Sequence, residues 1–162
     1  MMTRRQVCIL IASPLTAAQP PGVTAKLSTA PRYNFPALPE QKPSTTDKAQ
    51  GEAIGKHRSL PAAALKKGRW VKLSDGRRLW RLAIHSPKAV GIRVHFTRFA
   101  AGPGKVWLYG GAESVGPYTA AGIDETGSFW TDTVFSDLVT VEYEGKLASP
   151  PFQIVEITHL FR

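Results

Sequence analysis

The sequence contains a single cysteine, Cys8, among its 162 residues. One cysteine excludes an internal disulfide framework and the zinc modules that use two or more cysteine ligands. No apolar run approaches the roughly 20 residues that a transmembrane helix needs, and no complete catalytic motif is present. The 13 prolines and 14 glycines argue against a helical bundle. Because 43% of the residues are hydrophobic, a packed core is nevertheless expected.

Acidic residues are also few, with 12 Asp and Glu against 21 Lys and Arg, which gives a net charge of +9. The excess is uneven, because residues 57–88 carry a net charge of +8 whereas residues 89–162 carry −3. The basic segment surrounds two tryptophans, a combination typical of proteins that bind single-stranded nucleic acid. Trp80, however, alternates in phase with Leu82 and Ile84, so its ring is predicted to point into a core. We therefore expect no nucleic-acid partner.

The first residues have the features of a secretory signal peptide. Arg4 and Arg5 precede a short apolar stretch, Val7–Leu15, and Thr16–Ala18 supplies the small residues found at cleavage sites. We therefore predict a signal peptide over residues 1–18 and a secreted or periplasmic protein without a membrane span. The alternative interpretation of the same residues is a buried N-terminal strand.

Residues 19–55 are rich in Pro, Ala, Thr, Ser, Lys and Gln, and their few large apolar residues follow no period. Such a segment buries too little apolar surface to offset its conformational entropy, so we predict a disordered, extended linker. A β-sandwich domain is predicted over residues 56–162. It begins with a short helix between Ser59 and Gly68, which has a proline in its first turn and two lysines in its last.

From Trp70 onward, apolar side chains recur at every second residue, as in half-buried strands. Seven short strands separated by turn residues predict an all-β fold, an antiparallel β-sandwich or jelly roll. These strands are Trp70–Leu73, Leu79–Ile84, Ile92–Phe96, Lys105–Tyr109, Phe129–Val134, Val139–Tyr143 and Phe152–Thr158. The predicted core residues are Trp80, Phe96, Trp107 or its neighbour Leu108, Trp130 and Ile154. The alternative prediction is that Trp107 faces solvent, because Val106 and Leu108 share the opposite face of that strand.

The candidate catalytic residues of the sequence do not form a complete motif. Ser114, within Gly111–Gly116, has one residue too many before it for a nucleophile elbow, so we predict a surface loop there. His85 and His95 are predicted on the polar faces of neighbouring strands, as an exposed pair rather than as metal ligands. His159 is predicted to be packed or hydrogen-bonded rather than to act as a base.

The densest acidic group offers one cofactor candidate. Asp124 and Glu125 lie between predicted strands, and Ca²⁺ prefers several oxygen ligands from loops. No EF-hand spacing is present, so a plain solvated surface is the alternative. No other metal, no other cofactor and no catalytic residue is predicted.

The strand region carries a family resemblance in Gly76–Phe96, Gly104–Tyr109, Gly116–Thr119, Phe129–Thr133, Asp137–Tyr143 and Phe152–Arg162. Together these segments resemble the N-terminal, non-catalytic region of secreted bacterial trypsin-like serine peptidases of the lysyl-endopeptidase-like group. The resemblance implies a propeptide or accessory domain that assists the folding, inhibition or targeting of a protease. It also implies a trypsin-like serine protease domain, in cis or in trans, as the partner. The catalytic Ser, His and Asp of those peptidases have no counterparts here, so the chain is predicted not to be an enzyme.

Two functions therefore stay open. The first is a monomeric, secreted β-sandwich that accompanies a serine peptidase. The second is a β-sandwich that binds carbohydrate or extracellular matrix, for which Tyr109, Tyr118 and Trp130 would form the stacking surface. The resemblance leaves open whether the chain is a truncated protease, a fragment or a free-standing copy of the module.

Overall fold

The computed structural model describes residues 18–39, 54–121 and 123–161, so nearly all of the predicted signal peptide lies outside the described residues. The helical segments are α1 (Pro21–Thr24) and the 3-10 helix η2 (Ala62–Lys67). The strands are β1 (Arg32–Asn34), β2 (Gly55–Ser59), β3 (Arg69–Lys72), β4 (Arg78–His85), β5 (Gly91–Thr97), β6 (Lys105–Gly110), β7 (Glu113–Tyr118), β8 (Phe129–Trp130), β9 (Leu138–Glu144) and β10 (Gln153–Leu160). The predicted all-β fold is confirmed.

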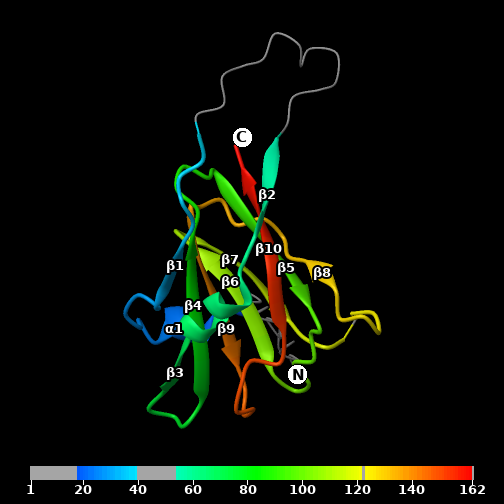
Figure 1. Cartoon of the computed structure of the whole chain (residues 1–162). Coiled ribbons are helices and arrows are strands. Elements are labelled where there is room, and N and C mark those ends of the chain that lie inside the picture. Colours follow the sequence, from blue (N-terminus) through cyan, green and yellow to red (C-terminus); the bar gives the residue numbers. More distant parts are fainter. Residues whose placement is uncertain (1–17, 40–53, 122, 162) are drawn as a thin grey trace, which may run out of the picture.

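Two sheets pack face to face (Figure 1). Sheet A has the strand order β1-β4-β9-β6-β7, and β3 pairs with β4 beside it. Sheet B has the order β2-β10-β5-β8. The pair β1–β4 is parallel and the remaining pairs are antiparallel. The predicted two-layer sandwich is therefore confirmed, whereas its finer classification as a jelly roll stays a prediction.

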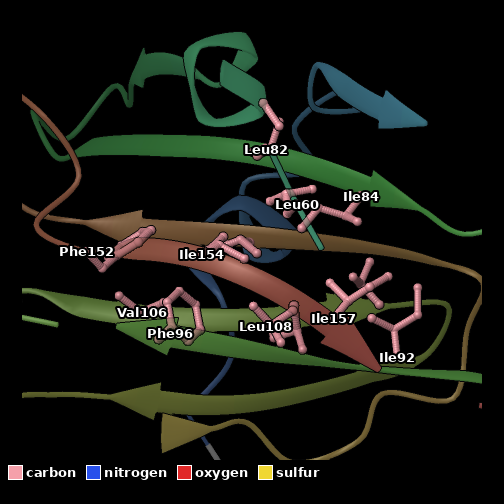
Figure 2. Close-up of a cluster of buried hydrophobic side chains, with 14 of the residues drawn as sticks. Leu60, Leu82, Ile84, Ile92, Phe96, Val106, Leu108, Phe152, Ile154 and Ile157 are labelled. Atoms are coloured by element: carbon pink, nitrogen blue, oxygen red, sulfur yellow. The ribbon is translucent and has the colours of Figure 1, made fainter. Parts of the chain in front are cut away.

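Alternation along the strands directs one set of apolar side chains between the sheets, where they form a continuous core (Figure 2). Four of the predicted core residues belong to it and are at most 3% exposed, namely Trp80, Phe96, Leu108 and Ile154. Trp130 is only half-buried. Its cross-strand partner is His95 on β5, so both side chains lie on the outer face of sheet B.

Residues 18–39 pack against the sandwich, and we call them the N-terminal strap. β1 extends sheet A, with Tyr33 opposite Ile84 of β4. Phe35 is 6% exposed and belongs to the core cluster, and the guanidinium carbon of Arg58 lies 4.4 Å from the centre of its ring. The structure thus differs from the predicted linker over residues 19–39, because backbone pairing and a few isolated apolar side chains attach this segment. Residues 40–53 of that linker lie outside the described residues.

The structure differs from the predictions in the cap of the helix, in the place of Ser114 and in the length of one strand. The predicted helix is present as η2, but Ser59 belongs to β2 and provides no side-chain cap. Ser114 lies on β7 rather than in a loop, and the predicted strand Phe129–Val134 is reduced to the two residues of β8 and a single bridge at Val134.

Candidate functional site

The outer face of sheet B carries a group of polar and aromatic side chains that we call the Trp130 cluster: His57, His95, Ser128, Trp130 and Glu156. The His95 ring stacks on the Trp130 ring with centroids 4.6 Å apart, and the His57 ring meets it edge-on at 5.0 Å. Both imidazoles also contact the same carboxylate, because Nδ1 of His95 lies 3.1 Å from Oε1 of Glu156 and Nδ1 of His57 lies 3.4 Å from Oε2.

Within this cluster, Ser128, His95 and Glu156 contact one another in the order used by serine hydrolases. Oγ of Ser128 lies 3.0 Å from Nε2 of His95, whose other ring nitrogen contacts Glu156. An acyl-transfer site also needs backbone N–H groups free to bind an oxyanion beside the nucleophile. Here the Ser128 N–H donates to Oγ1 of Thr126 at 3.2 Å and the Gly127 N–H donates to the Asp124 carbonyl at 3.0 Å. The two nearest amides are therefore already used.

The N-terminal strap covers the outer face of sheet A around Arg81 and Glu142, where it conceals a charged group. The Glu142 carboxylate is fully buried and receives hydrogen bonds from the Gly22 N–H and the Tyr109 hydroxyl, each at 2.8 Å. Nε of Arg81 lies 3.2 Å from the same carboxylate, and Nη1 of Arg81 donates to the Ser28 carbonyl at 2.8 Å. The ion pair is thus closed by the strap from two directions.

Burial and the Glu142 charge raise the pKa of the Tyr109 phenol above its usual value, so Tyr109 stays protonated and donates a hydrogen bond to Glu142 at physiological pH. Trp107 lies on the same face of sheet A, as its alternative orientation predicted, but it is only 3% exposed. Within the described residues, its indole N–H is buried without a hydrogen-bond partner. A buried donor of this kind costs stability.

A second buried polar group joins β2 and β10 of sheet B to Ser86, the residue that follows β4 of sheet A. Nη1 of Arg58 donates to Oγ of Ser86 at 2.8 Å, so the Ser86 hydroxyl can donate in turn to Nδ1 of His159, also at 2.8 Å. Burial and then the Arg58 charge lower the pKa of His159. The prediction that His159 is packed and hydrogen-bonded is confirmed, since it is 2% exposed.

The geometry thus shows a well-packed β-sandwich, and a comparison with protein families gives it an identity. The family model described as "Lysyl endopeptidase N-terminal domain" matches residues 27–144. The chain belongs to this family. No curated protein and no solved structure that was compared with the chain matches it.

The match begins inside the strap and includes every strand from β1 to β9. The lysyl endopeptidase N-terminal domain is the non-catalytic region of its proteases, so the resemblance seen in the sequence is confirmed. Over the described ranges, no helix is long and apolar enough to cross a membrane.

The three aromatic residues predicted as a stacking surface lie on different parts of this domain. Tyr109 takes part in the covered ion-pair group, and Trp130 lies on the outer face of the other sheet. Tyr118, on β7, packs against Phe129 and donates a hydrogen bond to Asp132, with its pKa raised by burial to about 12. The fold therefore does not bring them together into one platform, and we do not propose carbohydrate binding.

The calcium candidates lie in an exposed turn. The Asp124 carboxylate accepts hydrogen bonds from the side chain and backbone of Thr126, which lower its pKa. Among the described residues, no three His, Cys, Asp or Glu side chains are grouped as a metal site would require, so Glu125 gains no such partners. His85 and His95 do not meet either, because β4 and β5 belong to different sheets.

The Trp130 cluster and the covered ion pair escaped sequence reasoning because their members are far apart in the chain. Glu156 and His95 are 61 positions apart, and Gly22 and Glu142 are 120 apart. The one available signal was the outward phase of His95 on its strand. It indicated an exposed imidazole without indicating its neighbours.

Proposed function

We propose that the chain is a secreted, non-catalytic accessory domain that binds a lysyl endopeptidase domain, in cis or in trans, assists its folding and holds it inactive. The observation that carries the proposal is the family match over residues 27–144, which includes every strand except β10. The domain acts as a monomer, and its contribution is a preformed surface rather than a reactive group.

Two structural observations support a binding role. The core is continuous, and among the buried side-chain polar atoms of the described residues only Nε1 of Trp107 has no hydrogen-bond partner, so the domain has the rigidity that preorganised binding requires. The chemistry of the Trp130 cluster also supports a non-catalytic role, because the amides of Gly127 and Ser128 are engaged within their own turn. Catalysis of bond cleavage would then belong to the partner domain alone.

The proposal is tested by adding the purified chain to a lysyl endopeptidase catalytic domain made as a separate polypeptide. We expect the chain to slow hydrolysis of a lysine ester or amide substrate and to raise the yield of active protease on refolding from denaturant. Serum albumin at equal concentration is the control for general protein effects. If the chain neither binds the protease, nor slows it, nor aids its refolding, the proposal is wrong.

The predicted secretion is tested separately, by expressing the chain with its own N-terminus and sequencing the exported protein. We propose that the leader is removed near Ala18, at the start of the strap. A chain that stays inside the cell with its first residues intact would contradict that part of the proposal.

A further inference from the structure

Three exposed apolar side chains lie at one end of the sandwich, and we call them the apolar end patch. They are Ile54 before β2, Val90 in the β4–β5 loop and Phe135 in the β8–β9 loop, which are 69%, 42% and 63% exposed. Exposed large apolar side chains that gather in one place are typical of protein interaction sites, whereas single ones carry no meaning.

The contacts around Gly91 and β10 place Ile54, Val90 and Phe135 at the same end of the sandwich. A Cβ built on Gly91 would lie 3.4 Å from Cδ1 of Phe135 and 3.3 Å from Cδ1 of Leu160. The Val90 N–H donates to the Leu160 carbonyl at 2.9 Å, and the Phe161 N–H donates to the Ile54 carbonyl at 2.9 Å. The half-buried side chains of Leu160 and Phe161 therefore join the patch.

The last strand, β10, ends inside this patch. Figure 1 shows the end of β10 (red) beside the start of β2 (teal), at the same end of the sandwich. The family is an N-terminal domain of endopeptidases, so in such proteins the polypeptide leaving the last strand leads toward the endopeptidase. The residues that follow β10 begin at the apolar end patch, and a domain joined there is held close to it at high effective concentration.

We propose that the apolar end patch is the surface on which a lysyl endopeptidase domain docks, with Phe135 as the central anchor. This inference rests on the proposed function and names the surface that performs it. Phe135 is the largest exposed side chain of the patch, and aromatic anchors contribute a large share of binding energy at interfaces. The partner's matching surface is apolar, because the exposed side chains that define the patch are hydrocarbon.

Two other surfaces fit the partner less well. The Trp130 cluster is polar, and its groups already bind one another. An apolar groove of about 560 Å³ lies beneath η2, lined by Leu65, Trp70 and Pro150 among others. It lies near the beginning of β10, roughly 20 Å from the strand's end, so a domain that follows β10 would have to reach back along the sandwich.

The test measures binding of the chain to a separately produced lysyl endopeptidase catalytic domain by titration calorimetry. We expect Phe135→Asp to weaken binding roughly 10- to 100-fold. Ile54→Asp should also weaken binding. Binding of the unchanged chain should persist at high salt, because apolar contacts are not screened as surface charges are. Thermal unfolding of each variant shows that the fold is retained, since both side chains are exposed.

Leu147→Asp is the matched control, because Leu147 is 47% exposed but lies in the loop between β9 and β10, at the other end of β10. It should bind like the unchanged chain. If Phe135→Asp and Ile54→Asp bind normally while Trp130→Ala binds weakly, the docking surface is the Trp130 cluster and the inference is wrong. If the unchanged chain does not bind at all, the proposed function itself is wrong, and the inference falls with it.

Discussion

Replacement of Gly22 by Ala tests whether the N-terminal strap is part of the folded domain. Gly22 lies in α1, directly over the covered ion pair, and a Cβ there would overlap the Glu142 carboxylate and lie 3.1 Å from the Tyr109 hydroxyl oxygen. If residues 19–39 were a mobile linker, the change would be neutral. In a solvent-exposed helix it would even stabilise, by about 1 kcal/mol.

Because the strap is docked on the sheet, Gly22→Ala is instead predicted to lower the free energy of unfolding. Glu142 is held by Gly22, Tyr109 and Arg81 and has no solvent-exposed position to move into, since its side chain is 0% exposed. Loss of a buried hydrogen bond to a charged group costs about 1.5–3 kcal/mol, and crowding by an inserted methyl group costs about 1–3 kcal/mol. After subtraction of the helix gain, we expect a net destabilisation of roughly 1.5–5 kcal/mol.

Thermal and urea unfolding of the two chains measures this difference. For a protein of this size, roughly 1.5–5 kcal/mol corresponds to a fall in Tm of roughly 3–20 °C. Val23→Ala is the matched control, because Val23 is the next residue of the same helix, is 44% exposed and should change Tm little. A Gly22→Ala chain with an unchanged or raised Tm would show that the strap does not close the ion pair.

Three further predictions concern single side chains. The pKa of His159 is lowered in the folded state, so its contribution to stability is complete above its pKa in the unfolded chain, about 6.5, and is lost as the pH falls. The free energy of unfolding of His159→Gln should therefore decrease less on acidification than that of the unchanged chain. An equal decrease in the two proteins would contradict this. A serine-reactive fluorophosphonate should not label the chain, and labelling that disappears in Ser128→Ala would mean that the Trp130 cluster is catalytic. Trp107→Phe should change the free energy of unfolding by less than about 1 kcal/mol, because the loss of packing is offset by removal of a buried, unpaired N–H; a loss of several kcal/mol by urea denaturation would show that this N–H is bonded.

The strands of the two sheets were predictable wherever one face is buried and the other is not. The sequence of β5 alternates from Ile92 to Thr97 and that of β9 from Val139 to Glu144, so the phase of Phe96 could be determined without a structure. β1 could not be predicted in this way, because three residues of parallel pairing leave no detectable period. Its partner on β4 is about 50 positions away, and only the completed sheet edge gives its backbone groups a place to pair.

Trp107 shows the same limit at the level of one residue. The phase of its neighbours correctly places it on the outer face of sheet A, and a residue on an outer face is normally expected to be exposed to solvent. It is only 3% exposed, and its cross-strand neighbour Glu142 binds the Gly22 N–H, so the strap, a segment of low apolar content, reaches this face of the sheet. Composition predicts whether a segment can fold by itself, and it does not predict whether a preformed sheet will hold it.

The two outer faces consequently differ in what they can offer a partner. On sheet A, the strap supplies the Gly22 N–H and the Ser28 carbonyl to Glu142 and Arg81, and a partner would have to displace both hydrogen bonds from a buried ion pair. Leaving such a pair with an unpaired charge costs several kcal/mol. Binding to sheet A would therefore carry a large free-energy cost for displacing the strap. The apolar end patch, in contrast, loses only water when a partner covers Phe135. A protease domain that docks on the apolar end patch, as we propose, would therefore leave the strap and its ion pair in place.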